Sequence, residues 1–317
     1  MTLAVVLTAG TVNAMDGTPA KTKPVSFLSE GQRVVGVLHM PANFSESRTY
    51  PTVIIDGSWT TVKEQMQGLY ASKLADNGFL TLAFDHRYYG DSEGQPREYE
   101  NHTAKVQDIK NAMTYLQTLP YVDKERIAGV GVCASGAYMM QAVAEDDRFA
   151  ALGTVVAWLM TPETAKQFYG GDEGVNMRIH KAEQAEQQFV AGNGAQYVPA
   201  YDPNNKEAAM FFEVPYYGMK TRGDLPSWNN NFAVMGWKPW LTYDGIKSSN
   251  HVYVPTIMIG SKDQFLPDGA KEAFKNINSD AKKDVWLDQY QHAQFYDQPE
   301  PVSKSVNELV AFFNEHL

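Results

Sequence analysis

The sequence predicts an α/β fold with a mostly parallel, doubly wound sheet and helices on both faces. Between residues 51 and 160, short apolar segments typical of buried strands alternate with segments of helical period. This alternation then stops and resumes only at Val254, which leaves about 93 residues, 161–253, between two strands. A compact α/β unit needs far fewer. We therefore expect a core of residues 25–160 and 254–317, with residues 161–253 inserted as a cap between the sixth and seventh strands.

Composition and charge limit the function classes. The chain has 317 residues, 44% of them hydrophobic and 20% charged, which is enough for one large core. A formal net charge of -10 would repel nucleic acid phosphates, so we expect no nucleic acid partner. The single cysteine excludes an internal disulfide. The histidines are scattered along the sequence and form no recognisable set of metal ligands. The sequence implies no cofactor, and it does not predict an oligomeric state.

The N-terminal segment resembles a secretory signal. Residues 1–14 have an apolar stretch, and Val12-Asn13-Ala14 is a passable small-x-small cleavage site, but a basic start is missing. We interpret residues 1–24 as a clipped signal segment or an extended N-terminus. The first reading implies a periplasmic or secreted protein, and the second a cytoplasmic one. No later run is long and apolar enough to span a bilayer, so we expect a soluble protein.

In the first half of the core, residues 25–160, the sequence predicts a hairpin followed by alternating strands and helices. Residues 25–41 alternate in polarity around Glu30-Gly31 and predict a β-hairpin. Apolar runs predict strands, and apolar residues three and four apart predict helices. A glycine-punctuated polar loop, 85–97, follows the fourth strand. The expected elements are strands at 51–55, 79–84, 126–132 and 150–158, and helices at 64–77, 103–119 and 134–144.

The same patterns predict the elements of the inserted segment and of the second half of the core. The insertion combines a charged helical piece, 178–190, with aromatic, proline-bearing stretches at 211–217 and 228–243. We expect those aromatics to form a small core of their own and to line part of a pocket. The remaining core elements are strands at 254–260 and 284–287 and helices at 268–277 and 302–313.

The turn at Cys133 is the centre of the functional prediction. It lies between a valine- and glycine-rich strand and a helix of small residues, with Gly131 and Ser135 two positions away on either side. A nucleophile on such a sharp strand-to-helix turn needs small neighbours because bulk would clash. A thiol at a helix N-terminus is also favoured as the thiolate. In a second register, Ser135 would be the nucleophile, with Cys133 and Ala137 as its small neighbours.

An acid and a histidine follow the turn in the order expected of a catalytic triad. Asp263 lies just past the strand at 254–260, at the edge where open parallel sheets carry their chemistry. His292 lies on a loop after the last strand, about thirty residues further on. We expect Asp263 to orient the ring and His292 to act as general base.

Five features together resemble the α/β-hydrolase superfamily, and more narrowly its dienelactone-hydrolase-like branch with a cysteine nucleophile. They are GSW at 57–59, FDHRYYGDSEG at 84–94, GVCAS at 131–135, GSKD at 260–263, and His292. The resemblance covers about 25–160 and 254–317. It implies an oxyanion hole formed by the backbone N–H groups of Ala134 and of Ser58 or Trp59. Two features depart from the pattern: Ser135 stands where glycine is commoner, and the minimal dienelactone hydrolases lack the long cap, so their substrate is not transferred.

The resemblance and the residues together predict a hydrolase that acts on a small carboxylic ester, lactone or thioester through an acyl-cysteine. The aromatic insertion favours a small-molecule substrate with an apolar or aromatic portion. Arg87 either holds a substrate carboxylate or pairs with neighbouring acids such as Asp91. Two alternatives remain open: an acyltransferase on the same triad, and a small-molecule binding protein that kept the fold without turnover.

Overall fold

The chain begins with an antiparallel hairpin on the edge of the sheet. The computed structural model describes residues 21–317, so the signal-like residues 1–14 lie outside the described residues. Strands β1 (Lys21–Ser29) and β2 (Gln32–Met40) pair across Glu30 and Gly31, which both have positive φ angles of 48° and 78°. Two such residues form the tight turn that matches strand twist. The predicted hairpin is confirmed, and β1 includes residues 21–24 as well.

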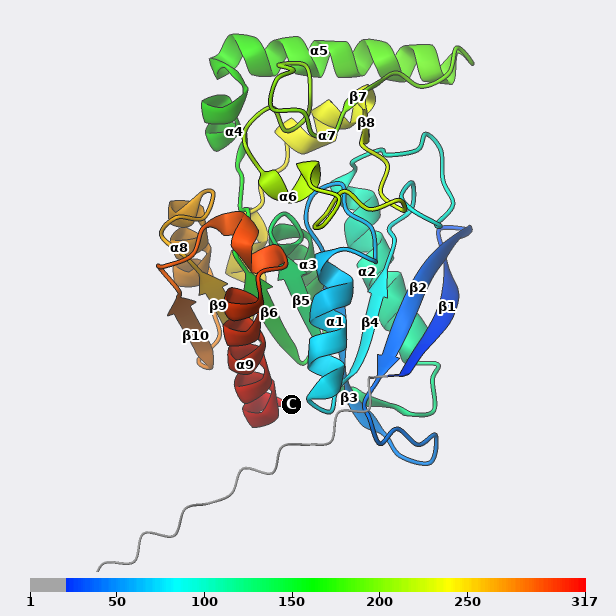
Figure 1. Cartoon of the computed structure of the whole chain (residues 1–317), viewed down its shortest axis with the longest axis vertical. Coiled ribbons are helices and arrows are strands. Elements are labelled where there is room, and N and C mark those ends of the chain that lie inside the picture. The colour runs from blue at the N-terminus through cyan, green and yellow to red at the C-terminus, as the bar shows by residue number, and fades with distance from the viewer. Residues whose placement is uncertain (1–20) are drawn as a thin grey trace, which may run out of the picture.

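The core is one eight-stranded sheet in the order β1-β2-β4-β3-β5-β6-β9-β10 (Figure 1). All pairings from β4 to β10 are parallel, and the two antiparallel pairings of this sheet are those of β2 with β1 and with β4. The predicted fold class is therefore confirmed. The parallel strands are β3 (Tyr50–Asp56), β4 (Leu80–Phe84), β5 (Val122–Val132), β6 (Ala151–Val155), β9 (Thr256–Gly260) and β10 (Lys282–Trp286).

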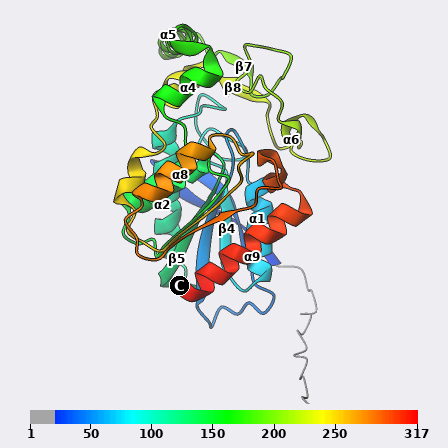
Figure 2. The ribbon, with the colours of Figure 1, turned by 90° about the vertical axis from the view of Figure 1, so that its left-hand side faces the viewer.

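Helices cover both faces of this sheet (Figures 1 and 2). One face carries α1 (Met66–Asp76) and α9 (Pro299–His316), and the other carries α2 (His102–Leu116), α3 (Ser135–Glu145) and α8 (Pro267–Asn276). Because both faces are covered, β4, β6 and β9 are buried along their whole length. The sequence predicted each of these elements. The largest differences are at β1 and β5, which each begin four residues before the expected boundary. Strand β6 ends three residues before its expected boundary, where Val156 takes a φ of 40°.

Residues 161–253 connect β6 to β9 and lie above the carboxyl edge of the sheet (Figure 1). The elements of this segment are α4 (Pro162–Tyr169), α5 (Gly171–Val190), β7 (Tyr197–Pro199), α6 (Pro215–Gly218), β8 (Asn231–Ala233), η1 (Val234–Gly236), α7 (Trp237–Leu241) and η2 (Lys247–His251). Helix α4 begins at a capping box in which the Thr161 side chain accepts the N–H of Thr164.

None of the helices in residues 21–317 is long and apolar enough to cross a membrane.

Candidate active site

Cys133 lies in the sharp turn that joins β5 to α3. Its φ of 57° is in the left-handed region, which costs energy for a residue with a side chain. Gly131 makes the turn possible, because a Cβ there would overlap the carbonyl oxygen of Ser135. Ser135 is the first residue of α3 and is 1% exposed. The strained backbone that is expected at a nucleophile is therefore found at Cys133 and not at Ser135. Ser135 also does not line the adjacent pocket.

The loop after β3 lies beside this turn because β3 pairs with β5, with Asp56 opposite Gly131. The N–H of Ser58 is directed to Met66 Sδ, 3.4 Å away, so it is not free for an oxyanion. The backbone N–H groups of Trp59 and Ala134 instead face the Cys133 sulfur. Of the two oxyanion candidates in this loop, Trp59 has the better placed backbone.

The environment of the thiol contains opposing effects. Burial raises the pKa of Cys133, because the charged form loses its solvation. The hydroxyls of Ser58 and Tyr296 act in the opposite direction, as do the N–H groups of Ala134 and Trp59. The result is a pKa above the ordinary value, and all four groups are donors that would stabilise the thiolate once it forms.

His292 is near the thiol but separated from it by one hydroxyl. It begins η3 (His292–Tyr296), and its Nε2 is 3.0 Å from Tyr296 Oη. Tyr296 in turn faces the sulfur of Cys133. The backbone N–H of Phe265 donates to His292 Nδ1 at 3.2 Å, so the neutral ring carries its proton on Nε2. Burial lowers the pKa of His292 to about 3, which keeps the ring neutral at physiological pH.

Asp263 lies apart from this pair. Its side chain is exposed, and its backbone N–H donates to Ser261 Oγ at 3.1 Å. Within residues 21–317, its carboxylate makes no hydrogen bond or ion pair. The position that a triad acid would occupy, at His292 Nδ1, is taken by the N–H of Phe265. The structure thus brings Cys133 and His292 close together through Tyr296, and leaves Asp263 on the neighbouring turn.

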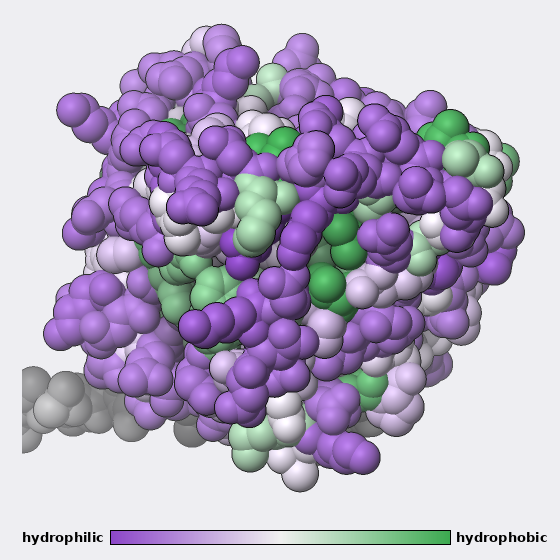
Figure 3. Space-filling model, turned by 90° about the horizontal axis from the view of Figure 1, so that it is seen from above, coloured by the Kyte–Doolittle hydropathy of each residue, from purple (hydrophilic) through white to green (hydrophobic). Residues whose placement is uncertain are grey.

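A small pocket of about 20 Å³ lies beside Cys133. Its wall is mainly aromatic and aliphatic and includes no charged side chain. Seen from above, the molecule is mainly hydrophilic, and hydrophobic residues show in hollows of this face (Figure 3). The core contributes Ser58, Trp59, Cys133, Ala134, Trp158, Phe265 and Tyr296 to the pocket, and the segment between β6 and β9 contributes Met210, Phe212, Val214, Tyr217 and Trp240.

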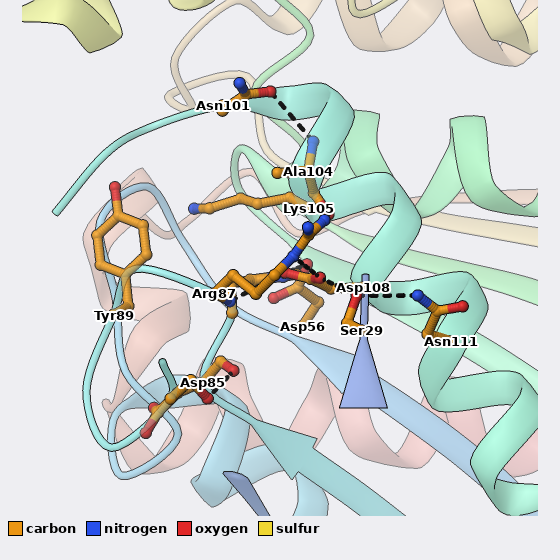
Figure 4. A network of polar contacts seen from close by, with 12 residues as sticks. Ser29, Asp56, Asp85, Arg87, Tyr89, Asn101, Ala104, Lys105, Asp108 and Asn111 are labelled. Atoms are coloured by element: carbon orange, nitrogen blue, oxygen red, sulfur yellow. Dashed lines mark hydrogen bonds and ion pairs between the residues drawn. The ribbon is translucent and has the colours of Figure 1, made fainter. Parts of the chain in front are cut away.

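Arg87 is not part of this pocket. It belongs to a buried ionic network beneath the turn, where its Nε donates to Asp108 Oδ1 at 2.6 Å and its Nη2 to the carbonyl oxygen of Ala104 (Figure 4). His86 lies in the same network, with Nε2 2.9 Å from Asp56 Oδ2 and Nδ1 3.3 Å from Asp108 Oδ2. Arg87 was expected either to hold a substrate carboxylate or to pair with a neighbouring acid. In the structure it pairs with an acid, but this acid is Asp108 and not Asp91.

Sequence reasoning missed two residues near the sulfur, Tyr217 and Tyr296. Tyr217 Oη donates to Ser58 Oγ at 2.7 Å, and Tyr296 Oη is 3.2 Å from the same oxygen. Tyr296 follows His292 by one helical turn, a spacing that could have indicated it. Nothing in the local pattern distinguishes Tyr217 from the other aromatics of its segment. Among the described residues, no cluster of His, Cys, Asp and Glu has the arrangement of a metal site.

A comparison with protein families matches residues 4–169, more than half of the chain, to a family described as "Esterase FrsA-like". Among curated proteins, the uncharacterized protein YcjY of Escherichia coli K12 is 27% identical over 308 residues, covering 92% of this chain and 98% of that protein. A thiohydrolase of Eupenicillium brefeldianum is 36% identical over 98 residues, which are 31% of this chain and 32% of that enzyme.

The fold is also found in solved structures. The crystal structure of the hypothetical protein PA2218 from Pseudomonas aeruginosa superposes with a TM-score of 0.81 and 25% identity, covering 98% of this chain and all of that one. The agreement over nearly the whole length includes the segment between β6 and β9.

Proposed function

The chain belongs to the FrsA-like esterase family, and on this premise we propose that it cleaves an ester or thioester through an acyl-cysteine intermediate at Cys133. Lactones are included, because their ring opening proceeds by the same attack on a carbonyl carbon. The observation that carries the proposal is the strained turn, with a φ of 57° at Cys133 and the N–H groups of Ala134 and Trp59 beside its sulfur. This arrangement has a nucleophile and an oxyanion hole within reach of one carbonyl group.

In the proposed first half-reaction, the thiolate of Cys133 attacks the carbonyl carbon and a C–S bond forms. The carbonyl oxygen becomes an oxyanion, which the N–H groups of Ala134 and Trp59 stabilise. The bond between the carbonyl carbon and the leaving oxygen or sulfur then breaks, and the leaving alcohol or thiol takes up the proton that His292 had removed from the Cys133 thiol. Water attacks the carbonyl carbon of the thioester, the C–S bond breaks, the acid is released, and a proton from the water returns to the sulfur.

His292 is the proposed base, because it is a buried, neutral imidazole one hydroxyl from the sulfur. To accept a proton at Nε2, the ring must carry its other proton on Nδ1 and give up the N–H of Phe265. An acceptor for that Nδ1–H is then needed. Asp263, two residues before Phe265 on the same turn, remains our proposed acid, and its carboxylate would have to replace the Phe265 N–H.

We further propose that residues 161–253 act as a cap that selects the acyl group. Support comes from the five residues of this segment in the pocket wall, among them Phe212 and Trp240, and from the absence of charge in that wall. A neutral acyl group with an apolar or aromatic portion suits such a pocket, because an unpaired carboxylate would lose its solvation there.

The test uses the purified full chain and a series of 4-nitrophenyl esters and matching thioesters that differ in acyl group. We expect a burst of 4-nitrophenolate equal to the enzyme concentration, which reports acyl-enzyme formation. Turnover should increase from acetyl to larger apolar acyl groups. A steady decline with acyl size would contradict the cap's proposed role, and no activity with any member would favour a binding protein. An acyl-enzyme that decays only when an alcohol or amine acceptor is added would identify an acyltransferase.

A further inference from the structure

Three hydroxyl groups lie together beside Cys133, each from a different part of the fold. Ser58 lies on the loop after β3, Tyr217 on α6, and Tyr296 on η3. All three are buried and line the pocket together with Cys133. Ser58 Oγ is 2.7 Å from Tyr217 Oη and 3.2 Å from Tyr296 Oη. Both Ser58 and Tyr296 face the sulfur.

The direction of the protons in this cluster follows from counting donors and acceptors. His292 carries its proton on Nε2, because the N–H of Phe265 donates to Nδ1, and so Nε2–H donates to Tyr296 Oη. Tyr217 donates its hydroxyl proton to Ser58 Oγ. Tyr296 can donate either to Ser58 or to the sulfur. When Tyr296 donates to Ser58, the Ser58 hydroxyl accepts from both tyrosines and its own proton is directed to the sulfur. When Tyr296 donates to the sulfur, the Ser58 hydroxyl can donate either to Tyr296 or to the same sulfur.

We propose that Ser58 acts through its side chain as a hydrogen-bond donor to the reacting sulfur, and that Tyr217 and Tyr296 are positioning residues that hold this hydroxyl in place. The proposal rests on the proposed function of Cys133 and deepens it. Such donors matter here because the pocket offers the thiolate no cation: the titratable groups that face the sulfur are the two tyrosines, with His292 behind Tyr296. Burial raises the pKa of both tyrosines well above 10, so both remain protonated donors.

The position of Tyr217 makes the inserted segment part of the catalytic centre. Besides the bonds of Tyr217 itself, two hydrogen bonds join this segment to the loop after β3: Gln65 Nε2 donates to the Gly223 carbonyl oxygen at 2.7 Å, and Trp228 Nε1 to that of Thr60 at 2.9 Å. Arg222 forms a bidentate ion pair with Asp297, at 2.6 and 2.7 Å, next to the His292 loop. Tyr217 is thus held between the two loops that flank the nucleophile.

The experiment measures the thiol directly. Alkylation of the full chain by iodoacetamide is followed by intact mass between pH 7 and 11, and the single cysteine makes the adduct unambiguous. The rate follows the thiolate fraction. We expect the midpoint to rise by about one pH unit in Ser58→Ala, which is about a tenfold loss of thiolate at fixed pH, and by a smaller amount in Tyr217→Phe and Tyr296→Phe.

Tyr216→Phe is the matched control. Its ring packs on those of Tyr217 and Tyr296, with centroids 5.2 and 5.1 Å away, but its hydroxyl is outside the cluster. We expect its midpoint to equal that of the wild type. An unchanged midpoint in both Ser58→Ala and Tyr217→Phe would overturn the proposal, and Tyr217→Phe alone decides if Ser58→Ala does not fold.

The result is separable from the proposed function, because alkylation needs no turnover. Shifted midpoints together with full esterase activity in Cys133→Ala would uphold the hydroxyl cluster and reject Cys133 as the nucleophile. Unchanged midpoints together with lost activity in Cys133→Ala would uphold the nucleophile and reject the cluster.

Discussion

Stability is expected to fall as pH rises from 7 to 8, because His86 is buried as a cation. Both ring nitrogens face carboxylates, Asp56 at 2.9 Å and Asp108 at 3.3 Å, so both are donors in the folded protein. Burial alone would lower the pKa of His86, but the charge of Asp56 and the hydrogen bonds to Asp108 and Asp56 outweigh it and raise the pKa to about 9. In the unfolded chain, the same ring titrates near 6.5.

The sign and size of the effect follow from these two values. A group whose pKa is raised on folding contributes stability below its unfolded pKa and loses it as pH rises toward the folded value. Between pH 7 and 8, the unfolded chain releases a proton from His86 that the folded protein keeps, which lowers the free energy of unfolding by about 1.2 kcal/mol. Burial lowers the pKa values of His39, His102 and His292, so the unfolded chain still binds part of a proton at each of these rings near pH 7 that the folded protein does not bind. These three groups together raise stability by about 0.4 kcal/mol over the same interval, and the net fall should be about 0.8 kcal/mol.

Urea unfolding at four pH values in this interval measures the slope, and pH 8 stays below the range in which the buried Cys133 thiol begins to contribute. Asp56→Asn is the comparison variant, because it retains the shape of the side chain but removes the first charge partner of His86. We expect a smaller slope and lower stability in this variant. A free energy of unfolding that is constant or rises from pH 7 to 8 in the wild type would refute the account of this network.

Three further predictions concern the pocket and the turn. His292→Ala should abolish turnover of an activated ester, and Asp263→Asn should lower kcat by about 100-fold or more without changing Tm, since its side chain is exposed; wild-type kcat in either variant would exclude that residue. Phe212→Ala should raise the ratio of kcat/KM for a bulky acyl ester over an acetyl ester about tenfold, and an unchanged ratio would remove Phe212 from the acyl site. Gly131→Ala should destabilise the chain by about 1–3 kcal/mol, because its Cβ overlaps the Ser135 carbonyl; a wild-type thermal melt would contradict the geometry of the turn.

The sequence predicted the core well because its signals are local. The apolar run at Thr256–Gly260 and the helical period of Pro299–His316 each identify one element, and strict alternation fixes their arrangement as a parallel sheet. The sharp turn at Cys133 was also predictable, since its requirement for small neighbours is visible within five residues.

The surroundings of the sulfur were harder to predict because they depend on contacts between distant segments. Tyr217 reaches Ser58 from 159 positions away, and no local pattern encodes such a contact. Nothing in the sequence distinguishes His86 from the other scattered histidines, because its charge depends on Asp56 and Asp108 from two other elements. The exposure of Asp263 likewise follows from how one turn packs, which residue order alone does not determine.

The central claim is that Cys133 is the nucleophile, and a mass measurement tests it most directly. The full chain is mixed with an excess of a slowly deacylating 4-nitrophenyl ester, quenched in acid, and analysed by intact mass and peptide mapping, in parallel with Cys133→Ala and Ser135→Ala. We predict a single acyl adduct on Cys133 in the wild type and in Ser135→Ala, and no adduct or turnover in Cys133→Ala. An acyl adduct with full activity in Cys133→Ala, lost in Ser135→Ala, would contradict the claim and move the nucleophile to Ser135.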